Sequence, residues 1–299
     1  MKKSKTLANT LRVGLIQTTL NPNYAWGSEE LPRDQMTSYS ENHLWHEIKK
    51  GFSALKNHSA LPNITILPEL SIPRGYEKSL HAFAQKTNSV IIGGLDFAVT
   101  RSTIRNKAIV IIPNNWPKKG YSRKCTVRYF GKTFFSHMEE DHFKKLGLHG
   151  VPDPSMYLFD SVEFGRFGVA ICSDFFDIER FVVYRGQIHH MIVISSNRDI
   201  TSYNFLAEAI GRLVYCNVVI CNSGFYGGSF VFSPFQNPIL RTIYRHEGKD
   251  LFTTQLVELP VSTLDRAQNS SDGKDPEFKS QPPGYNVRLK RNVVRQTLP

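Results

Sequence analysis

Short apolar runs rich in β-branched residues recur along this chain, and longer amphipathic segments separate them. Runs of this kind have the length and composition of buried strands. Eight stand out: Val13–Gln17, Ile64–Leu67, Val90–Gly93, Ala108–Ile112, Phe167–Ile171, Met191–Ser195, Val218–Cys221 and Phe230–Phe232. Helical periodicity marks a segment with Leu44, Trp45, Ile48, Phe52 and Leu55 on one face, and the segments Ile178–Tyr184 and Asn204–Tyr215. The alternation predicts an α/β protein in which helices cover a sheet.

The chain's 299 residues are enough for one large domain, which we expect to occupy residues 11–267. In this division residues 1–10 are an N-terminal extension and residues 268–299 a polar and basic C-terminal tail. From Asn269 onward the sequence is rich in Ser, Gly, Pro and charge, so we expect it to bury too little surface to offset its ordering entropy. Residues 21–42 are also polar and are expected to be a loop inserted before the first helix.

The chain is strongly basic, with a formal net charge of +11. Such a charge attracts nucleic acid, acidic membrane surfaces or anionic substrates without choosing among them, and solvated surface charge is the plainer interpretation. Two clusters contribute: Lys118, Lys119, Arg123, Lys124, Arg128 and Lys132, then Arg288, Lys290, Arg291 and Arg295.

The start of the chain lacks the apolar segment of a secretory leader, and no stretch is long and apolar enough to cross a bilayer. We therefore expect a cytoplasmic protein without membrane attachment. The cysteines show neither C-x-x-C pairs nor zinc-site spacing, and a reducing cytoplasm disfavours disulfides. Four free thiols are expected: Cys125, Cys172, Cys216 and Cys221.

Three side chains of reactive type follow predicted strands. Glu69 comes just after the strand that ends at Leu67, Lys132 follows the strand-like stretch TVRYF, and Cys172 follows Phe167–Ile171. The carboxyl ends of strands in α/β folds commonly open onto a ligand site. Each residue also has a plainer interpretation, because Glu69 suits a structural carboxylate, Lys132 a surface lysine, and Cys172 an inert thiol in an apolar strand.

Several other chemistries lack their motifs. The chain contains no G-x-S-x-G, no P-loop and no G-x-G-x-x-G, which excludes the serine hydrolases and nucleotide-binding proteins that use them. His137, Glu139, Glu140 and His142 lie in one stretch, but the two histidines do not have the one-face helical spacing of H-E-x-x-H. We therefore expect no metal site.

Six motifs, taken in chain order, resemble those of the nitrilase superfamily of carbon–nitrogen hydrolases. They are LRVGLIQ at the first strand, ILPEL with Glu69, GKTFFSHMEE with Lys132, GVAICSD with Cys172, RLVYCNVVICNSGFYGGSFVFSP from Arg212, and LFTTQLVELPVSTLDR. The likeness extends over residues 11–266 in the family's order. It implies a four-layer α-β-β-α sandwich, no metal or organic cofactor, and assembly as a homodimer or larger homo-oligomer.

A Glu, a Lys and a Cys form the catalytic set of that family, and the resemblance carries their roles onto Glu69, Lys132 and Cys172. A second, supporting Glu in the lysine motif carries onto Glu140 rather than its neighbour Glu139. A buried lysine needs a partner to stay charged, so we expect Glu140 to hold Lys132 in place.

The residue types suit the chemistry that the resemblance implies. A thiol is mostly protonated at neutral pH, so Glu69 is expected to take its proton as Cys172 attacks a carbonyl or nitrile carbon. Lys132 and the backbone N–H of Ser173 are expected to stabilise the charge that builds on the substrate. Water, activated by Glu69, would then hydrolyse the thioester.

The stretch around the cysteine departs from many relatives, which have an aromatic residue after the nucleophile where this chain has Ser173. We therefore expect a reshaped pocket. Arg198 suits a substrate carboxylate or phosphate, although a structural ion pair explains it equally well, and aromatic residues near a core usually belong to that core. The candidate substrate-binding residues are Phe176, Asn197, Arg198 and Tyr226.

The leading hypothesis is cysteine-dependent hydrolysis of a non-peptide carbon–nitrogen bond in a small-molecule substrate, an amide or carbamoyl group rather than a nitrile. One alternative is an acyltransferase that passes the same thioester to an amine. The other is a nitrilase-like regulatory or nucleic-acid-associated module, of a defence system for example, which would bind with an affinity that falls steeply as salt rises.

Overall fold

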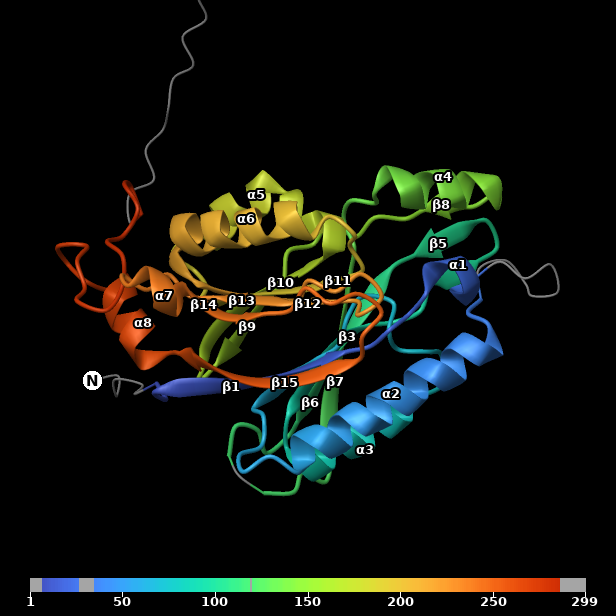
Figure 1. Cartoon of the computed structure of the whole chain (residues 1–299), viewed down its shortest axis with the longest axis horizontal. Helices are drawn as coiled ribbons and strands as arrows, with labels where there is room; N and C mark the ends of the chain where they lie inside the picture. The colour runs from blue at the N-terminus through green and yellow to red at the C-terminus, as the bar shows by residue number, and fades with distance from the viewer. Residues whose placement is uncertain (1–6, 27–34, 119, 286–299) are drawn as a thin grey trace, which may run out of the picture.

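Two six-stranded sheets packed face to face form the centre of the computed structural model, which describes residues 7–26, 35–118 and 120–285 (Figure 1). The first sheet has the order β15 (Thr253–Pro260), β1 (Thr10–Gln17), β2 (Ile64–Ile66), β3 (Val90–Gly94), β6 (Lys107–Pro113) and β7 (Cys125–Gly131). The second has the order β14 (Thr242–Arg245), β13 (Phe230–Phe232), β12 (Asn217–Asn222), β11 (His190–Ser195), β10 (Gly165–Ile171) and β9 (Leu158–Ser161).

Helices cover the outer face of each sheet, which gives the predicted four layers (Figure 1). The first sheet is covered by α2 (Ser38–Lys56) and α3 (Glu77–Thr87), and the second by α5 (Ile178–Tyr184) and α6 (Ile200–Ile210). A small sheet of β4 (Ala98–Thr100), β5 (Thr103–Arg105) and β8 (His149–Gly150) lies beside α4 (His137–Lys145). The short helices are α1 (Pro22–Ala25), α7 (Pro238–Arg241) and α8 (Ser262–Gln268).

The core between the sheets is built from alternate residues of the strands, because successive side chains of a strand point to opposite faces. In β1, Leu11, Val13 and Leu15 belong to the core between the sheets, whereas Ile16 packs with Phe52 of α2. The strands β10, β11 and β12 bury nearly all their residues, as expected for parallel strands covered on both faces.

Two sets of parallel strands place their carboxyl ends at functional positions. In the first sheet β1, β2 and β3 are parallel, and in the second β10, β11 and β12 are parallel. Loops that follow strands of one parallel set emerge at the same edge of the sheet. Glu69 follows β2, Cys172 follows β10, and Asn197 follows β11.

The eight predicted strands are all present, while two other expectations need correction. The helix expected to continue to Tyr215 changes at Gly211 into a π-helical turn, Gly211–Tyr215. The expected insertion at residues 21–42 contains α1 and the start of α2, whose N-cap is Thr37; its residues 27–34 lie outside the described part of the chain.

The first part of the predicted tail is packed onto the domain, against the expectation from its composition. Phe278 is 1% exposed and stacks on Phe235, and Tyr285 packs against Tyr215. A few aromatic side chains therefore anchor residues 269–285 despite their polar neighbours. The basic cluster of Arg288, Lys290, Arg291 and Arg295 lies outside the described residues, and the domain division itself stays a prediction.

All four cysteines are free, as predicted. Cys216 and Cys221 are fully buried, and burial raises the pKa of both thiols, which makes them inert packing groups. Among the described residues, no helix combines the length and apolar character needed to span a membrane.

Candidate active site

The predicted Glu69 and Lys132 form a buried ion pair. The Lys132 Nζ lies 2.8 Å from Glu69 Oε1, and the two residues are 1% and 3% exposed. Lys132 follows β7 and its backbone N–H donates to the carbonyl of Asn106. Lys132 is therefore a buried residue and not part of a surface basic cluster, and the Glu69 carboxylate compensates for the hydration that its ammonium group loses on burial.

The second carboxylate on Lys132 belongs to Glu139 and not to the predicted Glu140. Lys132 Nζ donates to both oxygens of Glu139, over 2.8 and 2.7 Å. Glu139 is also the N3 residue of a capping box, in which its carboxylate accepts from the backbone N–H of Ser136. Glu140 points away, with a half-exposed side chain whose ionic contact is His137 at 3.7 Å. The family motif identified the right helix start but the wrong one of two adjacent glutamates.

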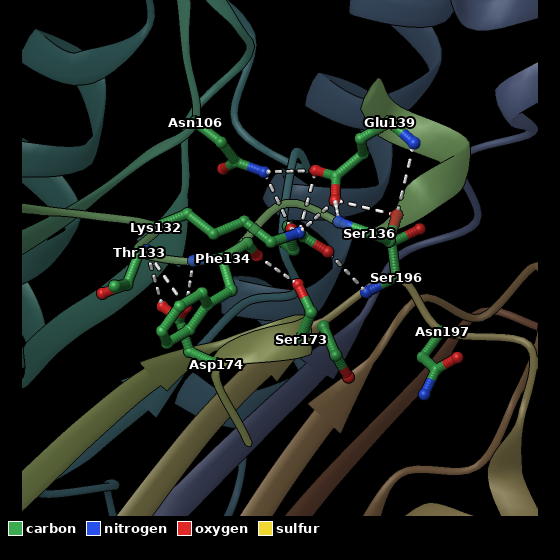
Figure 2. Close-up of polar contacts among 12 residues, drawn as sticks. Asn106, Lys132, Thr133, Phe134, Ser136, Glu139, Ser173, Asp174, Ser196 and Asn197 are labelled. Atoms are coloured by element: carbon green, nitrogen blue, oxygen red, sulfur yellow. Dashed lines mark hydrogen bonds and ion pairs between the residues drawn. The ribbon is translucent and has the colours of Figure 1, made fainter. Parts of the chain in front are cut away.

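Two groups that the sequence did not single out complete the environment of Glu69. Asn106 Nδ2 donates to Glu69 Oε1 over 2.8 Å and, at 3.4 Å, to Glu139. The backbone N–H of Ser196, in the loop after β11, donates to Glu69 Oε2 over 3.0 Å. Figure 2 shows Asn106 and Lys132 directed toward the carboxylate of Glu139. Together Asn106 and Ser196 fix the orientation of Glu69, which an ion pair with a flexible lysine would not do alone.

Cys172 sits on the turn that follows β10, in a conformation that is rare for non-glycine residues. Its φ is 47°, in the left-handed region. The residue is half-buried, and it begins a short 3₁₀ turn, Cys172–Phe176. A left-handed residue at a sharp strand-to-helix turn directs its side chain away from the strand, and Cys172 is thereby brought next to the ion pair.

Electrostatic effects link the thiol to both charged residues. Burial, and after it the negative charge of Glu69, raise the pKa of Cys172 to about 12, although Lys132 opposes them. Burial alone would lower the pKa of Lys132, but Glu69, Cys172 and Glu139 together raise it well above its usual value. The pKa of Glu139 is lowered despite burial, because Lys132 and Ser136 stabilise its charged form. The site therefore holds a charged lysine beside a protonated thiol.

Asp174 joins the lysine loop to the cysteine turn. The residue is 1% exposed, and its carboxylate accepts from the backbone N–H groups of Thr133 and Phe134, at 3.0 and 2.8 Å from Oδ1. Arg180 of α5 lies 3.7 Å from the same carboxylate. Ser173 contributes a side-chain hydrogen bond to the carbonyl of Phe134 (Figure 2). These bonds hold the segment after Lys132 against the segment after Cys172.

The loop of Glu69 is shaped by a close backbone approach. A Cβ on Gly94, at the end of β3, would lie 2.5 Å from both Glu69 Cα and Leu70 N, so glycine is required there. Leu70 has a φ of 56°, which makes it another left-handed residue next to a site side chain.

The predicted substrate-binding residues lie in loops at the carboxyl edge of the second sheet. Asn197 has its backbone fixed by Asn222, with hydrogen bonds of 2.8 and 2.7 Å in the two directions. Arg198 is exposed, and Tyr226 is half-buried. Burial raises the pKa of Tyr226; Arg198 opposes this shift, whereas Cys172 and Glu69 add to it. The Tyr226 hydroxyl therefore lies within electrostatic reach of all three residues. Phe176 is 52% exposed and packs edge-on against Tyr203.

Known structures share this architecture. Nit3 of Saccharomyces cerevisiae, a member of branch 10 of the nitrilase superfamily, matches with a TM-score of 0.61 at 17% identity, over 90% of this chain and 97% of Nit3. A CN-hydrolase superfamily protein from Xanthomonas campestris, with an arsenic adduct in its active site, matches with a TM-score of 0.62 at 12% identity, over 96% and 100% of the two chains. This chain has the nitrilase-superfamily fold.

A third matching structure is a mutant of the amidase from Nesterenkonia sp. AN1 with the acetamide moiety of fluoroacetamide covalently added at its active-site cysteine. Its TM-score is 0.60 at 12% identity, over 88% of this chain and 94% of the amidase. No protein-family model and no curated protein matches the sequence. Within the described residues, no group of three or more His, Cys, Asp or Glu side chains is arranged to hold a metal ion.

Proposed function

We propose that this protein is a carbon–nitrogen hydrolase that cleaves a non-peptide amide or carbamoyl bond through a thioester on Cys172. The observation that carries the proposal is the buried Glu69–Lys132 pair, 2.8 Å apart, next to a thiol whose pKa both residues shift. Likeness to nitrilase-superfamily proteins, one of them an amidase with an active-site cysteine, supports the reaction class.

In the first half-reaction Glu69 takes the proton of the Cys172 thiol while the sulfur attacks the carbonyl carbon. Negative charge builds on the carbonyl oxygen, and we assign its stabilisation to Lys132 Nζ and the backbone N–H of Ser173. Loss of one such donor typically lowers the rate about 100- to 1,000-fold. The carbon–nitrogen bond then breaks, and the leaving ammonia or amine takes the proton held by Glu69.

In the second half-reaction Glu69 removes a proton from water, which attacks the thioester carbonyl. The carbon–sulfur bond breaks, the carboxylic acid leaves, and the thiolate recovers its proton from Glu69. Glu139 helps to keep Lys132 charged throughout, because its own charge and hydrogen bond raise the pKa of that lysine. We assign substrate contacts to Asn197, Arg198, Tyr226 and Phe176, with Arg198 as the group for an anionic substituent.

The decisive experiment replaces Cys172 with Ala and measures hydrolysis of a panel of small amides and carbamoyl compounds. We expect turnover to vanish while the thermal unfolding transition remains. The matched control is Cys125→Ala, since Cys125 is also a half-buried free thiol but lies on β7, away from the ion pair. Hydrolysis that persists in the Cys172 variant would refute the proposal.

The fate of the thioester needs a separate measurement. Product analysis with and without added amines distinguishes hydrolysis, which yields the free acid in both cases, from acyl transfer, which yields a new amide only with the amine. Mass spectrometry of the wild type, quenched with acid during turnover, should also reveal an acyl group on the Cys172 peptide, because both outcomes pass through the thioester.

We further propose that the protein assembles as a homo-oligomer. Helices of the outer layer on the second sheet carry exposed large apolar side chains, among them Ile178 and Val182 of α5 and Phe205 of α6. Single exposed apolar residues are ordinary, but Ile178 and Val182 are four residues apart and so share one face of α5. A second copy of the chain is the partner that we assign to this face.

A further inference from the structure

A buried tyrosine of α6 has a hydroxyl that the catalytic set does not use. Tyr203 is 1% exposed, and its hydroxyl makes no hydrogen bond of normal length and angle within the described part of the chain. The hydroxyl lies beside the Cys172 thiol and within electrostatic reach of Glu69, since burial and both groups raise the pKa of the phenol well above its usual value. Buried hydroxyls are nearly always paired, so this one requires an explanation.

The ring of Tyr203 is held by the turn that carries the cysteine. Its centroid lies 5.6 Å from those of Phe175 and Phe176, in edge-on arrangements. Both phenylalanines belong to the 3₁₀ turn that begins at Cys172. The ring is therefore packed against the turn that carries Cys172, and this packing places the hydroxyl within electrostatic reach of the thiol.

The other groups around the thiol are already engaged. Glu69 and Glu139 raise the pKa of Cys172, and Lys132 and Tyr203 lower it. Lys132 donates three hydrogen bonds to the two glutamates. Tyr203 is the other donor, and its hydroxyl makes no hydrogen bond of normal geometry in the described chain. The Asn197 side chain also lies near this hydroxyl and lowers the pKa of the phenol, in opposition to Cys172 and Glu69. A high phenol pKa keeps its proton in place over the working pH range, so the hydroxyl remains a donor.

We propose that Tyr203 is a further catalytic residue, whose hydroxyl donates a hydrogen bond to the Cys172 sulfur as the thiolate forms. The thiol proton moves to the Glu69 carboxylate, and Tyr203 keeps its own proton. The same hydrogen bond stabilises the sulfur when the carbon–sulfur bond of the thioester breaks. This inference rests on the proposed function in assigning Cys172 as the nucleophile, but the electrostatic coupling of the hydroxyl to the thiol needs no substrate.

The test compares alkylation of Cys172 by iodoacetamide in the wild type and in Tyr203→Phe, over a series of pH values and without substrate. Phenylalanine keeps the ring contacts and removes only the hydroxyl. Loss of one hydrogen bond to the thiolate should raise the pKa of the Cys172 thiol by about one unit. Because the thiolate is the species that reacts with iodoacetamide, alkylation should then be about tenfold slower at every pH below the thiol pKa. Mass spectrometry of the separate cysteine peptides follows Cys172 and reads Cys125 in the same sample.

Two controls make the result specific. Tyr184→Phe removes the hydroxyl of another tyrosine that is 1% exposed, and this hydroxyl donates to the Tyr157 carbonyl over 2.7 Å. In this variant iodoacetamide should alkylate Cys172 at the wild-type rate. An unchanged Cys125 rate shows that the Tyr203 variant is folded. Equal or faster alkylation of Cys172 in folded Tyr203→Phe overturns the proposal. If the Tyr203→Phe variant is alkylated more slowly but the wild type cleaves no amide, the Tyr203–Cys172 interaction is supported and the proposed function is rejected.

Discussion

At the residue scale, Cys172 combines two unfavourable properties. Its left-handed backbone costs about 1–3 kcal/mol for a non-glycine residue, and its thiol is held protonated by burial and by Glu69. Leu70, adjacent to Glu69, is left-handed as well. Strained turns next to both members of an acid–nucleophile pair are expected where the position of a side chain matters more than local stability.

His190 is a buried residue whose surroundings predict a loss of stability in acid. Its Nε2 lies 2.9 Å from the carbonyl oxygen of Phe164 and its Nδ1 lies 3.1 Å from Asn217 Nδ2, an arrangement that suits a neutral ring. Burial and the neighbouring His189 lower the pKa of His190 to about 3. Below the ordinary histidine pKa of about 6.5 the unfolded chain binds a proton that the folded chain does not, so the free energy of unfolding falls by up to about 1.4 kcal/mol per pH unit.

The measurement is urea unfolding at several pH values between about 4 and 7. We expect His190→Gln to be less stable than the wild type at neutral pH, and its stability to decline less steeply as the pH falls. The control His149→Gln replaces an exposed histidine and should keep the wild-type slope. A His190 variant with that same slope would contradict the assignment of the proton to this ring.

Single residues also show where the sequence stopped being informative. Glu69, Lys132 and Cys172 each lie in a motif, and each was predicted. Asn106 and Tyr203 lie in no motif, and their importance depends on partners that belong to other elements. A local sequence pattern cannot identify a side chain that matters only through its contact with a residue distant in the sequence.

At the scale of elements, α4 decides which glutamate supports the lysine. A helix turns by about 100° per residue, so adjacent side chains point to different sides. Ser136 caps α4 and sets Glu139 at the N3 position, facing inward, which leaves Glu140 facing solvent. The capping box is present in the sequence as Ser136 and Glu139, and it favours Glu139 over Glu140 as the inward-facing residue.

We expect Glu139→Gln to lower both activity and stability. Glutamine keeps the capping box but removes the negative charge, so Lys132 loses one of its two counter-charges in a buried site. We expect the free energy of unfolding to fall by about 1–3 kcal/mol and amide hydrolysis to slow by at least about tenfold. Glu140→Gln is the matched control, measured by the same urea unfolding and turnover assays. If the two variants behave alike, the assignment of Glu139 is wrong.

Elements with a strong pattern were predicted, and those with a weak one were not. The eight apolar runs became strands because each fills a layer of the core. α3 was missed because it buries only Leu80 and Ala84. The π-helical turn after Ile210 was also missed: a Cβ on Gly211 would lie 2.5 Å from the Phe232 ring, a packing constraint that a helical pattern does not contain.

At the scale of the molecule, topology explains how Glu69 and Lys132, 63 residues apart in the sequence, come within 2.8 Å of each other. Glu69 follows β2 and Lys132 follows β7, and both strands belong to the first sheet. Cys172 follows β10 of the second sheet, and face-to-face packing of the two sheets brings its turn to the same site. Sequence patterns predicted the strands but not which sheet each joins. The two-sheet arrangement was predicted through the family resemblance alone, since periodicity does not distinguish one covered sheet from two packed ones.

The apolar face of α5 carries the last prediction, because it concerns how whole molecules meet. Ile178 is 76% exposed and Val182 is 60% exposed, so both lack partners within the described chain and gain them if a second copy covers this face. A double variant, Ile178→Glu with Val182→Glu, places two like charges on each side of such an interface, where repulsion and desolvation disfavour contact. We expect light scattering with size-exclusion chromatography to report a smaller assembly than the wild type.

Tyr39→Glu is the control for this prediction, because it alters an equally exposed residue of α2 in the opposite helical layer and should leave the mass unchanged. If the double variant keeps the wild-type mass, the interface lies elsewhere.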